Sequence, residues 1–98
     1  MIKVSVKKNN EYIDKISITG HAMYDDYGKD IVCSSVSSIV ITTVNAIERI
    51  DEESISYIEN PFSIKVLKRN EITNILLENM ISLLQELETQ YPKNIKFL

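Results

Sequence analysis

The chain begins with two short segments in which apolar and polar residues alternate. In residues 2–8, isoleucine and valine alternate with lysine and serine, which is the period of a strand with one face in water. Asn9 and Asn10 follow, and asparagine tolerates the left-handed backbone of a tight turn. The alternation resumes over residues 12–19. The sequence therefore predicts that the chain opens with a β-hairpin.

Two longer segments carry apolar residues at helical spacing. Residues 71–91 place isoleucine, leucine and methionine on one face and glutamate and glutamine opposite, and Pro92 ends the pattern because it has no N–H to donate. Residues 31–50 have a similar spacing, but their many β-branched side chains make a buried strand over residues 39–44 a competitor. Length favours the helix, because a strand in a small domain is much shorter.

A second hairpin and a short tail complete the chain. Residues 53–59 and 62–69 alternate about Asn60-Pro61, and residues 94–98 have the pattern of a brief last strand. The order ββαββα(β) with hairpin connections predicts an α+β fold, in which a mostly antiparallel or mixed sheet packs with two helices. Residues 1–98 are expected to form a single domain.

Composition narrows the function classes. Fourteen acidic against eleven basic side chains give a net charge of −3, which argues against a general affinity for nucleic acid or for an anionic membrane. The chain has one cysteine and one histidine, so an internal disulfide is excluded and a structural zinc site would need carboxylates or a second chain. No apolar run approaches the roughly 20 residues that span a bilayer, and no signal peptide is recognised. We expect a cytoplasmic protein with a reduced thiol and no cofactor.

Cys33 falls in the first turn of the helix predicted over residues 31–50. If Asp30 is the N-cap, its carboxylate accepts from the N–H groups of Val32 and Cys33. The positive end of the helix then favours the thiolate, which is the nucleophilic form of cysteine. The competing interpretation is that Cys33 is a small buried hydrophobic residue beside valines. Asp30 also has an alternative role, in which it orients His21.

His21 lies at the other end of the connection between the second strand and the helix. Such a connection can bring His21 and Cys33 together, and imidazole is a suitable base for a thiol. Without that contact, His21 is a surface side chain with no partner. Ser37 follows Cys33 by one helical turn, so its hydroxyl either orients the thiol or substrate or bonds back to a helical carbonyl. Gly20 either lets a substrate backbone approach or ends the strand with positive φ.

The connection itself, residues 20–30, is long for so small a domain, and long loops in compact domains are usually functional. Tyr24 and Tyr27 either cover a bound peptide or anchor the loop to the core. Asp25 and Asp26 either attract a basic substrate segment or keep the loop solvated. A metal site built from the histidine, the cysteine and the aspartates between them mixes hard and soft ligands without a recognisable spacing, so no metal is expected.

The chain resembles the ribosomal-processing cysteine protease family, Prp, in two segments: Gly20-His21-Ala22 and Gly28-Lys29-Asp30-Ile31-Val32-Cys33-Ser34-Ser35-Val36-Ser37. The resemblance implies a cysteine endopeptidase that removes the short N-terminal extension of a bacterial large-subunit ribosomal protein, cuts after an aromatic-containing motif and works as a homodimer. It also implies a catalytic dyad of His21 and Cys33, with Gly20, Asp30 and Ser37 matching further motif positions. Ser34 stands where alanine is usual, which changes the polarity beside the thiol.

Two hypotheses for the function stay open at this point. In the first, the Cys33 thiolate attacks a peptide carbonyl with His21 as base and acid, and N–H groups at the helix start, including that of Cys33, donate to the oxyanion. The partners are then the N-terminal segment of a ribosomal protein and a second copy of the chain, with no nucleic acid and no membrane. In the second, the protein is a non-enzymatic ribosome-assembly or ribosomal-protein binding module with a buried thiol.

Overall fold

The computed structural model describes residues 1–26 and 30–98, and its element order is ββαββαβ. The strands are β1 (Ile2–Asn9), β2 (Tyr12–Thr19), β3 (Ile55–Glu59), β4 (Phe62–Val66) and β5 (Ile95–Phe97). The helices are α1 (Ile31–Ile50) and α2 (Glu71–Gln90). This order confirms the predicted α+β fold with two hairpins and two helices.

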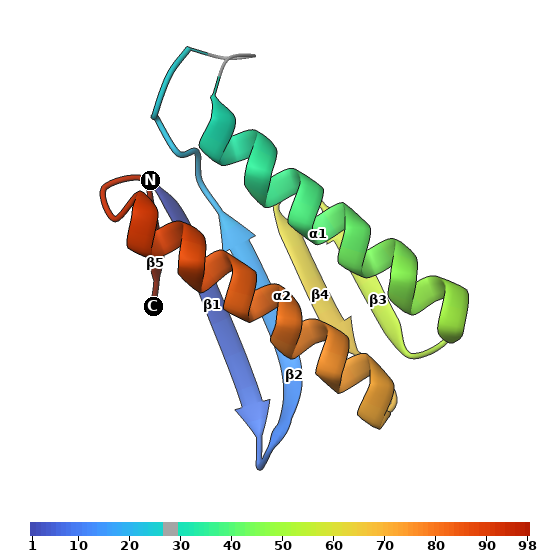
Figure 1. Ribbon diagram of the computed structural model, residues 1–98. Helices are drawn as coiled ribbons and strands as arrows, with labels where there is room; N and C mark the ends of the chain where they lie inside the picture. Colours follow the sequence, from blue (N-terminus) through green and yellow to red (C-terminus); the bar gives the residue numbers. More distant parts are fainter. Residues whose placement is uncertain (27–29) are drawn as a thin grey trace.

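The strands form one mixed sheet in the order β3-β4-β2-β1-β5 (Figure 1). The hairpin of β1 and β2 turns at Asn10, whose φ is 59°. β4 joins β2 and β3 joins β4, both antiparallel, whereas β5 pairs with β1 in parallel. The parallel pair arises because the chain crosses back through α2 before it returns to the sheet.

Both helices lie on the same face of the sheet (Figure 1). Each begins at a side-chain cap: Asp30 accepts from two backbone N–H groups at the start of α1, and Asn70 does the same for α2. The core lies between this helical layer and the inward-facing strand residues, and it includes Val4, Ile16, Val36, Ile64, Leu77 and Leu84. The other face of the sheet has no helix over it in the described part of the chain.

The second hairpin is shorter than predicted at both outer ends. The N–H and the hydroxyl of Ser54 both donate to the carbonyl oxygen of Asp51, at 3.1 and 2.8 Å. Ser54 in turn accepts from the N–H of Leu67, and Lys68 forms an ion pair with Asp51 at 2.7 Å. The Ser54 N–H thus donates to the turn at Asp51 and not across to the other strand, and the ladder stops at Ile55 and Val66, so the predicted bounds at residues 53 and 69 are wrong.

Helix α1 also corrects an expectation about membranes. An 18-residue window of α1 has a mean hydropathy of 1.5, so among the described residues this helix meets the length and composition of a bilayer span. The expectation that no apolar run approaches that length is therefore wrong. The core helix of a globular domain meets the same criterion, and the valines Val32, Val36 and Val40 on the inner side of α1 are at most 6% exposed. Packing in the domain thus explains the inner side of α1, which is the buried 33% of the window.

Candidate active site

Asp30 fixes the start of α1 and the loop before it. One carboxylate oxygen accepts from the N–H groups of Val32 and Cys33, both at 3.0 Å, as the predicted N-cap requires. The other oxygen accepts from the N–H of Tyr24 at 3.0 Å. Burial acts to raise the pKa of Asp30, but the backbone N–H donors, led by that of Cys33, outweigh it and leave the pKa below its ordinary value. Asp30 therefore stays ionised and holds the loop and the helix together.

This cap corrects one mechanistic expectation. The N–H of Cys33 and that of Val32 both donate to Asp30, so neither is free to donate to a substrate oxyanion in this arrangement. The backbone donor directed at the thiol is instead that of Ala22, whose N–H lies 3.4 Å from the Cys33 sulfur. This donor, three residues after the end of β2, contacts the sulfur and not the position of a substrate oxyanion.

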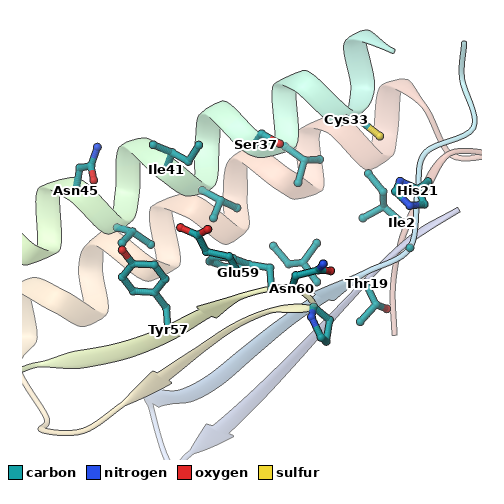
Figure 2. A pocket seen from close by; sticks show the side chains of 17 residues that line it. Ile2, Thr19, His21, Cys33, Ser37, Ile41, Asn45, Tyr57, Glu59 and Asn60 are labelled. Atoms are coloured by element: carbon teal, nitrogen blue, oxygen red, sulfur yellow. The ribbon is translucent and has the colours of Figure 1, made fainter. Parts of the chain in front are cut away.

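Cys33 and His21 lie at the same end of one pocket. Cys33 is half-buried in the first turn of α1, and His21 is exposed two residues after β2 ends. Figure 2 shows the sulfur projecting from α1 toward the end of the pocket where His21 lies. The interpretation of Cys33 as a small buried hydrophobic residue holds only in part, because its side chain packs against the core on one side and lines the pocket on the other.

The pocket has a volume of about 580 Å³ and lies between α1 and the turn of the β3–β4 hairpin. Figure 2 shows Cys33 and His21 at one end and Asn45 and Tyr57 at the other. Most of the wall between these ends is apolar and is formed by Ile2, Ile18, Val36, Val40, Val44 and Phe62. An elongated apolar cavity that begins at a thiol and an imidazole suits a peptide with apolar side chains.

Of the three supporting residues, Asp30 caps α1, and Ser37 and Gly20 line the pocket. Ser37 lines the pocket one helical turn after Cys33, as predicted. Gly20 also lines it, and its φ of 86° is one that other residues rarely adopt. A Cβ on Gly20 would collide with the carbonyl oxygen of Met1, so close packing against the chain's own N-terminus already requires glycine here. Ser34, the departure from the family pattern, donates its hydroxyl to the Asp30 carbonyl oxygen at 3.0 Å and not toward the thiol.

The loop residues predicted to bind substrate lie outside the pocket lining where they are described. Tyr24 packs edge-on against Tyr91 with ring centroids 5.3 Å apart, which supports the interpretation that it anchors the loop. Asp25 and Asp26 are exposed, and the Asp25 carboxylate accepts from the N–H of Asp26. Tyr27 lies outside the described residues. Across residues 1–26 and 30–98 no group of three potential ligands is arranged to hold a metal ion.

Asn94 is a residue that sequence reasoning missed. Its side-chain amide donates to the Ala22 carbonyl oxygen at 2.9 Å, and its own carbonyl accepts from the N–H of Ile2 at 2.8 Å. Ala22 is therefore held on both sides, by Cys33 through its N–H and by Asn94 through its carbonyl. No local pattern marks Asn94, because the contact joins residues 72 positions apart.

Comparison with known proteins places this chain among the cysteine proteases. A family model described as cysteine protease Prp matches residues 1–96. The ribosomal processing cysteine protease Prp of Staphylococcus aureus is 34% identical over 102 residues, which cover 98% of this chain and 96% of that protein. The protein of the same name from Bacillus subtilis is 27% identical over 107 residues, which cover 98% and 95%. The chain belongs to the Prp family of cysteine proteases.

Solved structures agree with this assignment. The S. aureus protease Prp in complex with a covalently linked product peptide matches with a TM-score of 0.89 at 33% identity, over 99% of this chain and 97% of that one. The same protease in complex with a substrate peptide matches with a TM-score of 0.83 at 31% identity, over 100% and 98%. The hypothesis of a non-enzymatic binding module is therefore set aside.

Proposed function

We propose that residues 1–98 form one cysteine protease domain that removes the short N-terminal extension of a bacterial large-subunit ribosomal protein. The observation that carries the proposal is the position of Cys33 and His21 at one end of an elongated apolar pocket, in a chain of the Prp family. The protein acts in the cytoplasm as a homodimer and needs no cofactor. Relatives of 31% identity or more are known with product or substrate peptides.

Cys33 is the nucleophile and His21 the general base and acid. His21 takes the proton of the Cys33 thiol, and the thiolate attacks the scissile carbonyl carbon. The tetrahedral intermediate collapses to a thioester while His21 returns the proton to the leaving amine. Water, deprotonated by His21, then attacks the thioester, and the thiol is regenerated when the carboxylic acid product leaves. The imidazole of His21 accepts each proton that leaves the thiol or the water and returns it in the following step.

Backbone groups stabilise the charge that develops at this end of the pocket. The Ala22 N–H, at 3.4 Å from the sulfur, stabilises negative charge on the thiolate, and the N-terminal end of α1 adds its positive field. Asp30 preserves this geometry because it ties the loop to the helix. Ser37 orients the substrate beside the thiol, and Gly20 allows the strand end to lie close to Met1.

The apolar pocket takes the residues that precede the scissile bond. Its walls are aliphatic and aromatic, so they suit the aromatic-containing motif after which the family cuts. Asp25 and Asp26, which are exposed on the loop between His21 and Cys33, contact the substrate, while Tyr24 holds that loop against Tyr91. In this proposal the loop contacts the peptide from outside, since its described members do not line the cavity.

The test is cleavage of an extension-bearing ribosomal protein by the wild type and by single variants. Cys33→Ala and His21→Ala should each abolish cleavage, because the chain has no second cysteine or histidine to replace them. Ser37→Ala should only slow it. Alkylation by iodoacetamide, located by mass spectrometry, should modify Cys33 faster in the wild type than in His21→Ala. Full activity of Cys33→Ala would refute the proposal.

A further inference from the structure

The face of the sheet that points away from the helices is strongly basic. Its outward positions are occupied by exposed lysines from four of the five strands: Lys3, Lys7, Lys15, Lys65 and Lys96. These are five of the eleven basic residues of a chain whose net charge is −3. The acidic excess therefore lies elsewhere on the molecule. We call these five residues the lysine face.

Strand register places three of the lysines in one row. Lys7 is the direct partner of Lys15, and Lys15 is the direct partner of Lys65. Neighbouring strands are about 4.8 Å apart, and like charges directly opposite each other destabilise a sheet. Lys3 and Lys96 form a second pair at the other end of β1. An anion bound across these lysines would relieve the repulsion.

The residues between the lysines are hydrogen-bond donors too. Ser5 is the partner of Ser17, and Ser17 is the partner of Ser63, so a row of hydroxyls runs beside the lysine row. Among the described residues, the ion pair found is that of Lys68 with Asp51, and neither belongs to this face. Asp14 is the nearest carboxylate on β2. It is half-buried, beside Lys15 at the β-bulge, and has no register partner.

We propose that the lysine face binds the phosphate backbone of RNA. Phosphate oxygens are contacted in proteins by lysine and by serine hydroxyls, the two donor types that alternate here. Lys3 and Lys7 are separated by about 13 Å along β1, at roughly 3.3 Å per residue. A nucleic acid that carries one charge per 1.7 Å of duplex axis, or about half that density as a single strand, presents several phosphates over this length.

The same surface argues against the other anionic partners. Insertion into a membrane interface uses several aromatic or aliphatic side chains beside the basic ones, whereas the lysine row contains none and the serine row ends at a single exposed aliphatic residue, Ile58 of β3. An acidic protein partner would require carboxylates matched to the fixed spacing of the rows, while a flexible polyphosphate chain adapts to them. The absence of aromatic side chains in these rows also predicts binding without sequence preference. The net charge of −3 does not reveal this basic face, because it sums the charges of the whole chain.

The inference goes beyond the proposed protease activity and is tested separately from it. Fluorescence anisotropy of a labelled uridine homopolymer measures binding by the wild type over a range of KCl concentrations. The variant Lys7→Gln/Lys15→Gln/Lys65→Gln is compared with Arg49→Gln/Lys68→Gln/Lys93→Gln. The second variant also loses three positive charges, but at residues outside the strands. Losing three phosphate contacts should lower the affinity at least tenfold at low salt and make the slope of log K against log [KCl] shallower by about 2 units.

Further arms decide among the outcomes. The variant Lys7→Arg/Lys15→Arg/Lys65→Arg should keep RNA binding, since the charge is preserved. Peptide cleavage by the glutamine triple should equal that of the wild type, so a failed RNA result leaves the protease proposal untouched. The proposal is overturned if the wild type does not bind at low salt or if both glutamine triples lose affinity equally. It is also overturned if vesicles of phosphatidylglycerol or poly-glutamate bind through the three lysines while RNA does not.

Discussion

Ala22 contributes both of its backbone groups to the active site although its side chain has no chemistry. Its N–H contacts the Cys33 sulfur, and its carbonyl accepts from Asn94 near the C-terminus of the chain. Ala22 is 1% exposed, so no water competes for these groups. The adjacent residue is His21, and its backbone is therefore held by the same two contacts. At the residue scale, the orientation of the proposed dyad depends on Asn94, whose side chain donates to the Ala22 carbonyl between the two residues.

Asn94→Asp should lower kcat and leave KM nearly unchanged. The substitution keeps the shape of the side chain but replaces the amide donor with a carboxylate oxygen that repels the Ala22 carbonyl. A displaced catalytic group commonly reduces the rate by about tenfold to a hundredfold. Steady-state kinetics on an extension-bearing peptide measures the effect, and the rate of Cys33 alkylation should fall with kcat.

The matched control is Asn79→Asp, the same chemical change at an exposed position of α2. It should leave both kcat and the alkylation rate at the wild-type values. If Asn94→Asp reduces thermal stability but retains the wild-type kcat, Asn94 has a structural role alone and the positioning role assigned to it is wrong.

At the element scale, the start of α1 is defined by one side chain. The local signal at Asp30 was sufficient to predict both the cap and the first residue of the helix, because capping depends on residues only two or three positions apart. The strand order could not be predicted in the same way, since β5 pairs with β1 through contacts between opposite ends of the chain. The prediction of the outer ends of the second hairpin was wrong for a similar reason. Ser54 donates to the Asp51 carbonyl, a contact that the alternation of apolar and polar residues does not reveal.

The Asp30 cap predicts a pH dependence of stability. Net hydrogen bonding from the backbone holds the pKa of Asp30 below the 3.8 of the unfolded chain, although burial opposes it. A lowered pKa in the folded state adds stability above the unfolded value, and that stability is lost as the pH falls through the folded value. Asp30→Asn keeps a capping oxygen but replaces the acceptor for Tyr24 with an amide NH₂. The variant should be less stable than the wild type at neutral pH.

Unfolding midpoints measured from neutral pH into the acid range check this prediction. The difference between the wild type and Asp30→Asn should shrink once the pH falls below 3.8. Asp26→Asn, at an exposed loop position, should have the same unfolding midpoint as the wild type at neutral pH. A difference that persists unchanged at low pH would show that the carboxylate charge is not what stabilises the helix start.

At the scale of the whole molecule, the pocket is formed by segments from three parts of the chain. The end of β2 supplies His21, α1 supplies Cys33 and one long wall, and the β3–β4 turn supplies the opposite wall. The sequence predicted that His21 and Cys33 lie together, because they flank one loop and match a family motif, and both line this pocket. It did not predict the cavity, because Tyr57 and Glu59 come to face α1 only through the register of β4 with β2 and β3. Candidate reactive residues can be predicted from short sequence patterns, whereas the shape of the cavity that receives a substrate depends on the assembled sheet.

The length of the pocket predicts how much peptide is read before the scissile bond. From Cys33 to Asn45 the helix rises about 1.5 Å per residue, or about 18 Å, and an extended peptide covers that distance with about five residues. Peptides with five residues before the scissile bond should therefore be cleaved with a kcat/KM at least about a hundredfold higher than peptides with two, since each apolar side chain lost forfeits about 1.5 kcal/mol or more of burial. Longer extensions beyond this point should add little.

Val40→Phe tests the same pocket from the side of the protein. Val40 lines the middle of the cavity, so a phenyl ring there occupies space that the peptide needs and should raise KM for the longer peptide. Ile39→Phe is the control, because Ile39 lies next along α1 but lines the groove on the α2 side. Alkylation of Cys33 by iodoacetamide, which is small, should proceed at the wild-type rate in both variants. Equal losses of cleavage in the two variants would mean that the peptide does not lie along this wall of α1. The prediction that five residues before the scissile bond are bound would then also be wrong.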